Sequence, residues 1–379
     1  MGVFASFVGP SYTAASPIAD AERCVNWYPE RVDGHASGQS AVYYRPRPGH
    51  RVFTELRDSP VRGMLALNGR LFVVAGANFF EVLSNGGSRQ WGTVVNSPAP
   101  ATLSSNGDGG QQVFVVSGGS GYIFNLTTNF FDPIDPTLTA FPAIAVMGAF
   151  CDGYFLVLEA HSGKFYISTL EDGQLWAALD VAQVSESSNR IVALLVDHRQ
   201  VFLFGGLTTE VWYNSGYANF PFQPNQGGFL EQGILAPYSA CQIDNAVCWL
   251  GANQHGGGVV YRLDGASPKR ISTHAIEAIW ATYGALTNAI GWAYQDQGHP
   301  FYVLVFPTGP ATGDHVTWVY DVSTDLWHER ALWDDLALRY TLDVGRCHAF
   351  AFTKHLVGAR STGLIYEMRS DLYADEVPA

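Results

Sequence analysis

The sequence has few basic residues and no long hydrophobic run. Only 15% of its 379 residues are charged, three of them are lysines, and the net charge is −13. A protein that grips nucleic acid clusters Lys and Arg to neutralise phosphates, and this footprint is missing. A membrane-spanning helix needs about 20 consecutive apolar residues, and no segment approaches that length. These absences exclude a DNA-gripping protein and a helical membrane protein.

Cysteine is also scarce, with five residues and no Cys-x-x-Cys pair. The spacing of a structural zinc site is missing, and an odd cysteine count does not indicate a disulfide framework in a chain of this length. Cys151, Cys241 and Cys248 lie within apolar strand patterns, which predicts buried free thiols. Residues 1–10 lack the basic start and apolar core of a signal peptide. We expect synthesis in a cytoplasm and a fold without disulfides.

Hydrophobic and turn-forming residues are abundant. Hydrophobic residues make up 47% of the chain and aromatic residues 13%, and there are 40 glycines and 19 prolines. A disordered chain has the opposite balance of hydrophobicity and charge. A coiled coil would be rich in Ala, Glu, Lys and Leu. The composition therefore predicts an all-β fold with many short strands and frequent turns.

A pattern of short apolar strands and turns recurs after residue 60. Its first copy has Asn68-Gly69 between two apolar runs, which is a strong signal for a β-hairpin. Seven such units follow one another, and the first-turn residues of six of them are 40 to 53 residues apart: Gly69, Gly109, Gly153, His198, Asn245 and Gly298. A period of about 40–50 residues is typical of β-propeller blades. The last unit could share strands with the N-terminal segment to close the ring, which leaves the number of blades open. We predict a β-propeller of six or seven blades.

Residues 1–60 differ from the repeats because they contain scattered prolines and show little alternation of apolar and polar residues. We interpret them as an extended N-terminal arm, followed by the propeller over residues 61–373 and a C-terminal tail over residues 374–379.

One segment breaks the strand pattern. Ser272–Asn288 has apolar residues at helical spacing, with Ser272 or Thr273 as candidate N-cap. We predict one short helix there, bridging two blades.

The arm contains the one basic cluster of the sequence, formed by Arg45, Arg47, Arg51 and Arg57. The arm as a whole is neutral, because residues 1–60 contain six acidic residues and six arginines. The blades therefore carry the entire negative charge. We favour docking of this arm on a neighbouring acidic subunit, and a phosphate contact is the alternative.

An aromatic group is the second candidate interaction site. Phe220, Phe222 and Phe229 lie in a loop rich in Gln, Asn and Gly. An exposed aromatic loop would be a protein-contact site, whereas a buried one would fill the gap between two blades. The sequence leaves both interpretations open.

Motifs of catalytic or cofactor chemistry are missing from the sequence. It contains no Gly-rich phosphate loop and no HExxH, GxSxG or EF-hand spacing. His348 and His355 are seven residues apart in a predicted hairpin, and we interpret them as rim histidines rather than as a metal pair. Asp135 and Asp334 lie in loops where aspartate usually bonds its own backbone. We predict no catalytic residue, no metal site and no cofactor.

Several blocks of residues resemble those of one known family. They are Phe7–Tyr12, Arg23–Glu30, Glu210–Tyr213, Glu231–Ile234 and Arg270–Glu277. In these blocks the sequence resembles phage packaged-DNA stabilisation proteins, which are the tail hub or nozzle proteins of short-tailed phages. The resemblance is spread over most of the chain, and none of its blocks is a catalytic signature.

The resemblance implies a structural protein of the virion tail and not an enzyme. Such proteins are arranged as a six-fold ring of β-propeller subunits below the portal and its adaptor. The ring extends the DNA channel, retains the packaged genome and holds tail spikes or fibres. The implied partners are copies of the chain, adaptor or portal proteins, spikes or fibres, and double-stranded DNA that passes without sequence-specific binding. Family members often continue into further β structure, whereas this chain ends at Ala379.

The acidic net charge agrees with a conduit, because a channel that lets DNA slide should repel phosphates. Two other classes stay open. A propeller glycosidase or lyase acting on host surface polysaccharide would place a carboxylate pair in its central funnel. A kelch-like protein-binding module is suggested by Val316–Trp327, where a Tyr-Asp strand is followed by Thr and Trp.

Overall fold

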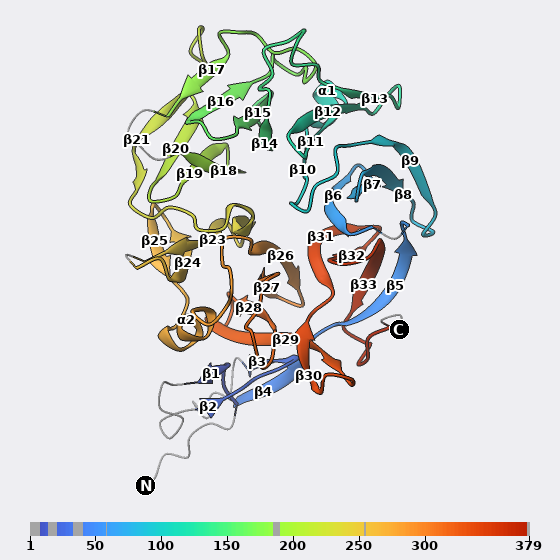
Figure 1. The fold of residues 1–379 in the computed structure, drawn as a ribbon, viewed down its shortest axis with the longest axis vertical. Coiled ribbons are helices and arrows are strands. Elements are labelled where there is room, and N and C mark those ends of the chain that lie inside the picture. The colour runs from blue at the N-terminus through green and yellow to red at the C-terminus, as the bar shows by residue number, and fades with distance from the viewer. Residues whose placement is uncertain are drawn as a thin grey trace.

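The computed structural model describes residues 8–13, 21–32, 41–57, 59–184, 190–253 and 255–376. Seven antiparallel sheets stand around a common axis, and each follows the previous one along the chain (Figure 1). The predicted all-β propeller is confirmed, and the number of blades is seven. Phe7, which belongs to the resemblance, and residues 377–379 of the expected tail lie outside the described residues.

In blades 1 to 6 the strands follow one another from the axis outward (Figure 1). Blade 1 consists of β6 (Val61–Leu67), β7 (Arg70–Ala75), β8 (Asn78–Val82) and β9 (Ser88–Thr93). Blade 2 consists of β10 (Thr102–Ser105), α1 (Gly107–Gly110), β11 (Gln112–Ser117), β12 (Ser120–Asn125) and β13 (Phe131–Pro133). Blade 3 consists of β14 (Ala145–Cys151), β15 (Tyr154–Glu159), β16 (Lys164–Ile167) and β17 (Val181–Gln183).

The second half of the propeller repeats this plan with two additions. Blade 4 consists of β18 (Ile191–Asp197), β19 (Gln200–Gly205), β20 (Thr209–Asn214) and β21 (Phe222–Leu230). The short helix η1 (Pro237–Ser239) precedes blade 5, which consists of β22 (Cys241–Ile243), β23 (Ala246–Ala252), β24 (Gly258–Asp264) and β25 (Ser267–Arg270). Blade 6 consists of β26 (Ile290–Asp296), β27 (His299–Val305), β28 (Thr317–Asp321) and β29 (Leu326–Asp334). The second half of β29 pairs with β30 (Arg339–Leu342) in a hairpin that extends this sheet.

The second strand is deeply buried in most of the blades. Residues of β11, β19 and β27 read QVFVVS, QVFLFG and HPFYVLV, and nearly all of them are buried. Continuous apolar runs of this kind are expected for a strand covered on both faces. Neighbouring blades provide the cover, as where Phe72 of blade 1 packs against Phe124 of blade 2 with ring centroids 5.3 Å apart. The core is therefore a ring of contacts between blades.

Positive backbone φ angles mark the hairpin turns predicted from the sequence. Asn68-Gly69 has φ values of 49° and 73°, and both Asp152-Gly153 and Gln297-Gly298 have values of 50° and 90°. Tight hairpin turns need positive φ at both central residues, and Asn, Asp and Gly tolerate this conformation. These turns join the first and second strands of blades 1, 3 and 6.

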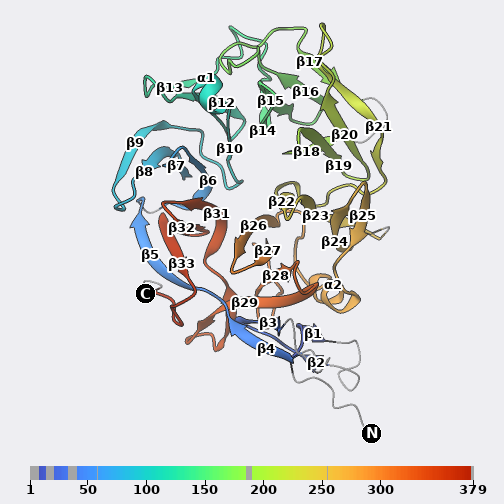
Figure 2. The same cartoon turned by 180° about the vertical axis from the view of Figure 1, so that it is seen from behind.

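The ring is closed by a strand from the other end of the chain. Blade 7 consists of β31 (Gly345–Ala351), β32 (Lys354–Ala359), β33 (Leu364–Arg369) and, outermost, β5 (Gly49–Glu55). The β5–β33 register runs from Glu55 opposite Leu364 to Gly49 opposite Arg369. Figure 2 shows β5 leaving blade 7 and leading directly toward blade 1. The last repeat thus shares a strand with the N-terminal segment, a closure that the sequence alone left open.

The part of the arm that precedes β5 packs against blade 6 (Figure 1). It contains two small hairpins, formed by β1 (Tyr12–Thr13), β2 (Ala21–Glu22), β3 (Trp27–Val32) and β4 (Ala41–Pro46). Glu329 of β29 donates its N–H to Cys24 O at 2.9 Å and accepts from Asn26 N–H at 2.8 Å. The arm therefore covers the outer edge of blade 6, an edge that would otherwise be open to another strand.

Helix α2 (His274–Trp280) lies between blades 5 and 6, so the predicted bridging helix is confirmed but ends before Asn288. Thr273 is its N-cap and accepts a hydrogen bond from Ile276 N–H at 3.4 Å. Trp280 is fully buried and packs on Phe306 of the loop after β27. Over the ranges described, the helices are all too short or too polar to cross a bilayer.

Candidate functional site

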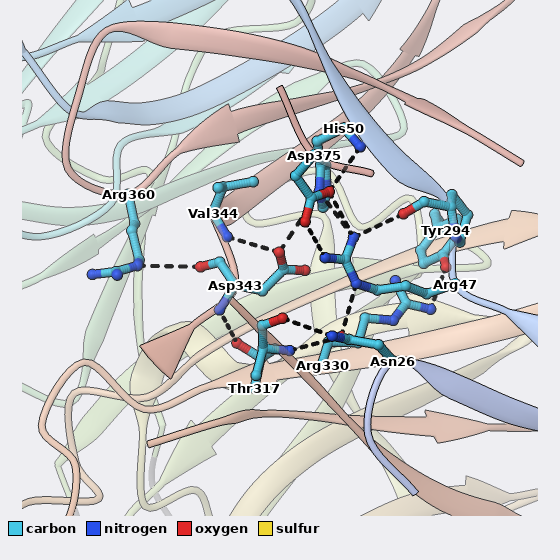
Figure 3. A network of polar contacts seen from close by, with 12 residues as sticks. Asn26, Arg47, His50, Tyr294, Thr317, Arg330, Asp343, Val344, Arg360 and Asp375 are labelled. Atoms are coloured by element: carbon cyan, nitrogen blue, oxygen red, sulfur yellow. Dashed lines mark hydrogen bonds and ion pairs between the residues drawn. The ribbon is translucent and has the colours of Figure 1, made fainter. Parts of the chain in front are cut away.

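A polar network joins the arm, blade 6, blade 7 and the C-terminal tail (Figure 3). We call it the clasp, and its members are Asn26, Arg47, His50, Asp343 and Asp375. Arg47 follows β4, His50 lies in β5, Asp343 lies between blades 6 and 7, and Asp375 belongs to the tail. Segments from both ends of the chain therefore meet at one place.

Arg47 and Asp375 form the centre of the clasp. Arg47 Nη1 donates to Asp375 Oδ1 at 3.1 Å and Nη2 donates to Oδ2 at 2.5 Å, so the guanidinium contacts the carboxylate at two points. The backbone N–H of His50 also donates to Asp375 Oδ1, at 3.0 Å. Burial opposes the charge of Asp375, but the hydrogen bonds from His50 and Arg47 outweigh it and lower the pKa of this carboxyl below its ordinary value. The geometry thus keeps Asp375 ionised.

Asn26 connects Arg47 to blade 6. Its Oδ1 accepts hydrogen bonds from Arg47 Nε at 2.8 Å and from Ala331 N–H at 2.9 Å, and its Nδ2 donates to Ala331 O at 2.9 Å. The backbone φ of Asn26 is 61°, in the left-handed region that asparagine tolerates better than most residues. An amide at this position both holds the edge of β29 and orients the guanidinium.

Asp343 is the buried acid on the other side of the clasp. Its Oδ1 accepts from Val344 N–H at 2.8 Å and lies 3.7 Å from His50 Nδ1. Burial alone would raise the pKa of Asp343, but its electrostatic interactions with His50, Arg47 and Arg330 lower it. Two acids and their cations therefore hold the closing strand β5 against the junction of blades 6 and 7.

A second ionic contact fixes the β3–β4 hairpin. His299 of β27 lies between two carboxylates, with Nδ1 2.8 Å from Asp321 Oδ2 and Nε2 2.9 Å from Glu30 Oε2. The hydrogen bond with Asp321 raises the pKa of His299, although burial opposes the charge. Glu30 also accepts from Arg45 Nη1 at 3.1 Å. The arm is thus attached to blade 6 through β3 as well as through the clasp.

The propeller axis is a narrow channel without acidic lining. A cavity of about 630 Å³ lies between the first strands of the seven blades. Apart from Arg62 and Arg346, its lining side chains are apolar or uncharged. The acidic side chains of the described residues therefore lie outside the lining of this cavity.

The four arginines of the predicted basic cluster have separate environments. Arg47 is buried in the clasp, and Arg45 pairs with an acid of β3. Arg51 is exposed, with Nε 3.8 Å from Glu376 Oε1. Arg57 adopts a φ of 54° and makes no ion pair within the described ranges. Three of the four arginines thus contact acids of their own chain.

The three phenylalanines also separate. Phe222 is buried in β21, and Phe220 is half-buried with its ring centroid 5.7 Å from that of Phe165 in blade 3. Phe229 is exposed on the same strand β21. The first two fill space between blades 3 and 4, and Phe229 is the one of the three that is available for a contact.

The polar residues considered for chemistry have structural contacts. His348 Nε2 lies 3.1 Å from His355 Nδ1, and burial together with the charge of His355 lowers the pKa of His348 to about 3. Asp135 and Asp334 accept hydrogen bonds from backbone N–H groups two residues further on, as expected of turn residues. In the part of the chain that the structure describes, no group of three or more His, Cys, Asp or Glu side chains is arranged to hold a metal ion.

Sequence reasoning missed the acidic half of the clasp. Asp375 lies in the short tail to which no role was given, and Asp343 follows β30 without a motif. Arg47 and Asp375 are 328 residues apart and meet only because the ring closes, so no local spacing marks the pair. Asn26 lies within the Arg23–Glu30 block of the family resemblance, which was the one available signal.

Solved structures of other propellers resemble this fold at low sequence identity. The extracellular domain of BT4673 from B. thetaiotaomicron has a TM-score of 0.55 and 11% identity over 85% of this chain, which spans 40% of that protein's length. Virginiamycin B lyase from Staphylococcus aureus has a TM-score of 0.52 and 10% identity, covering 83% of this chain and 98% of the lyase. A streptogramin B lyase has a TM-score of 0.52 and 8% identity, covering 91% and 98%. At such identities the likeness shows the fold alone.

The comparison with curated protein sequences gives no match. A family match, however, covers most of the chain, because the family described as bacteriophage P22 Gp10, β-propeller, matches residues 25–373. The matched range includes all seven blades and the segment that carries Asn26 and Arg47 of the clasp. The resemblance found in the sequence is thereby confirmed, and the chain belongs to the bacteriophage P22 Gp10 β-propeller family of phage structural stabilisation proteins.

Proposed function

We propose that this chain is a subunit of a tail hub, or nozzle, ring that conducts DNA in a short-tailed phage. The observation that carries the proposal is the family match over residues 25–373, which includes the whole propeller. Copies of the chain, six by family resemblance, form the ring below the portal and adaptor. The ring retains the packaged genome and holds tail spikes or fibres.

The size of the propeller axis supports a path for DNA between subunits. The axial cavity has a volume of about 630 Å³ and is lined by side chains of every blade. A DNA duplex, whose major groove alone is about 12 Å wide, is too large for such a space. A single propeller therefore cannot conduct DNA along its own axis, and a conduit requires several copies around a wider opening.

Two groups of exposed apolar side chains support contacts between copies. The first, which we call the hairpin patch, lies on β3 and on the β29–β30 hairpin and consists of Trp27, Trp333, Leu336 and Leu338. The second, the loop patch, lies on loops of blades 2 and 3 that are joined by a hydrogen bond from Ala140 N–H to Trp176 O, and consists of Leu138, Leu175 and Leu179. The elements that carry them lie at opposite ends of the long axis of the molecule (Figure 1). Two different patches in contact from copy to copy give a head-to-tail interface, which generates a ring when the rotation between successive copies closes.

Exposed residues of the closing strand and of blade 4 are candidates for contacts with other tail proteins. Arg51 is next to the clasp residue His50, and Arg57 lies beyond the other end of β5. Both face solvent, and an acidic adaptor surface would complement them. Phe229 is an exposed aromatic anchor on the outer strand of blade 4.

The test is the assembly state of the purified chain, with and without the adaptor protein of the same phage. We expect native mass measurements to show a closed oligomer and negative-stain images to show rings with an open axis. A monomer under all conditions would contradict the proposal. Cleavage of capsular or O-antigen polysaccharide by the protein would favour an enzyme instead.

A further inference from the structure

Among the residues that the structure describes, the charged side chains that line the axial cavity are two buried arginines from different blades. Arg62 of β6 and Arg346 of β31 are 2% and 8% exposed, and none of the other side chains that line this space is charged. Blades 1 and 7 are neighbours because β5 closes the ring, so the two guanidinium groups come from opposite ends of the sequence. A strongly acidic chain therefore places positive charge alone inside its axis.

Backbone carbonyls satisfy only part of these two side chains. Arg62 donates from Nε to Ala99 O at 2.9 Å and from Nη1 to Gly76 O at 2.8 Å, while its buried Nη2 has no partner. Arg346 donates from Nη2 to Pro98 O, while its buried Nε has no partner. Within the described residues neither side chain has a carboxylate partner. Buried N–H groups of a charged side chain without acceptors are costly, so both arginines carry an uncompensated charge that a nearby anion would stabilise.

A second cavity shares Arg346 and Tyr238 with the axial cavity, and a third arginine belongs to its lining. Its volume is about 540 Å³, and its lining includes Arg346, Arg360, Tyr238 and Asn288. Arg360 donates from Nε to Asp343 O at 3.2 Å (Figure 3) and forms no ion pair among the described residues. Four prolines, Pro98, Pro100, Pro237 and Pro307, supply much of the apolar wall. A concave apolar space of a few hundred Å³ with a few convergent polar groups is the usual form of a ligand site.

Electrostatics distinguishes Arg62, Arg346 and Arg360 from Arg47, the arginine of the clasp. Burial lowers the pKa of Arg62, of Arg346 and of Arg360, and the charge of Arg346 lowers that of Arg62 further. For Arg47 burial acts in the same direction, but Asp343 and Asp375 outweigh it and raise the pKa. An anion in the cavity lined by Arg346 and Arg360 would give these two arginines the compensation that carboxylates give to Arg47.

We propose that the cavity lined by Arg346 and Arg360 binds a phosphate group, either free phosphate or the phosphate of a small monoester such as a mononucleotide. Guanidinium groups present paired N–H donors that match phosphate oxygens. Phosphate carries close to two negative charges near pH 7, so it complements several arginines better than a single carboxylate does. The prolines and Tyr238 can cover the ring of a nucleotide. The inference does not depend on the proposed ring, because every residue belongs to one chain.

The test is calorimetric titration of the purified full chain with sodium phosphate and with deoxyadenosine monophosphate, at an ionic strength held constant with sodium chloride. We expect saturable binding of at least one of the two. Arg346→Gln and Arg360→Gln should each weaken it by about tenfold or more, because each removes a charged hydrogen-bonding partner. Arg360 is half-exposed, so Arg360→Gln keeps the test decisive if Arg346→Gln does not fold. Arg199→Gln removes an exposed arginine elsewhere and should bind like the wild type.

The two ligands distinguish the source of the phosphate. Equal affinity for both identifies a site for free phosphate, whereas tighter binding of the nucleotide shows that the apolar wall contacts its ring. Absence of saturable binding of both ligands would overturn the proposal, and so would equal affinity in Arg346→Gln, Arg360→Gln and the wild type. Competition by a short DNA duplex would also overturn it, in favour of nucleic-acid binding. Assembly into rings is measured separately, so failure of this site leaves the proposed function untouched.

Discussion

Arg47 and Asp375 form a two-point ion pair although 328 residues separate them in the sequence. The pair ties the strand that closes the propeller to the tail that follows its last blade. Both side chains are largely shielded, with 7% and 17% of the Arg47 and Asp375 side chains exposed. The closure of the ring is therefore fastened by charge as well as by the β5–β33 ladder.

Removal of the acid from this pair should destabilise the fold. Asp375→Asn leaves the shape of the side chain but leaves Arg47 buried with a neutral partner. We expect the free energy of unfolding to fall by about 3 kcal/mol, because breaking a buried pair strands the remaining charge. Urea unfolding followed by tryptophan fluorescence measures the change. Asp371→Asn is the matched control, since Asp371 pairs with Arg369 on the exposed surface and its loss should be without measurable effect.

The same carboxylates should make the fold sensitive to acid. The pKa values of Asp343 and Asp375 are lowered in the folded protein. Their contribution to stability is therefore complete above about pH 4, the ordinary pKa of aspartate, and is lost as the pH falls further toward the folded values. Below that pH, we expect the urea concentration at the unfolding midpoint to decrease. The decrease should be smaller in Asp375→Asn than in the wild type. Parallel curves for the two proteins would contradict the assignment.

The propeller itself could be read from the sequence because its signals are local. Asn68-Gly69 and Asp152-Gly153 reveal hairpins through residue types that tolerate positive φ. The apolar runs of β11 and β27 reveal strands buried on both faces. Repetition of these signals at a nearly constant period specifies blades, since one blade cannot bury both of its faces alone.

The closure and the sites could not be read in this way, because they are made by residues that are distant in sequence. Nothing in the segment Gly49–Glu55, with one apolar side chain facing solvent and another half-buried, marks it as the outer strand of blade 7. Arg45 and Arg47 look alike in the sequence, yet one pairs at the surface of the arm and the other is buried. Arg62 and Arg346 become neighbours only after blade 7 meets blade 1.

Ring closure by β5 can be tested at a glycine. A Cβ at Gly363 would clash with the backbone carbonyl oxygens of Arg57 and Leu56, next to the hydrogen bond from Leu56 N–H to Gly363 O. We expect Gly363→Ala to lower the free energy of unfolding by about 2–3 kcal/mol, because the backbone must shift to relieve the overlap. Gly206→Ala is the control, since nothing lies within 4 Å of its added Cβ. Equal stability of the two variants would argue against the close approach of β5 to blade 7.

The hairpin patch should be required for assembly and not for folding. Leu336 is 97% exposed and Leu338 is 73% exposed, so the double variant Leu336→Ser, Leu338→Ser should keep the melting temperature of the wild type. Light scattering after gel filtration should show a smaller assembly, because the head-to-tail contact loses its apolar anchor. Leu207→Ser changes an exposed leucine of blade 4 and should assemble normally. Unchanged assembly of the double variant would place the subunit interface elsewhere.

Two histidine sites should contribute to stability with opposite dependence on pH. His299 has a raised pKa between Asp321 and Glu30, so its contribution is complete below about pH 6.5 and is lost as the pH rises through the folded value. His348 has a pKa lowered to about 3 beside His355, so stability is lost as the pH falls from about 6.5 toward 3. In urea titrations between about pH 6.5 and 3, His348→Gln should lose less stability than the wild type as the pH falls. Above neutral pH, His299→Gln should lose less stability than the wild type as the pH rises. A variant whose effect appears at the opposite end of the pH range would contradict the contacts assigned to that histidine.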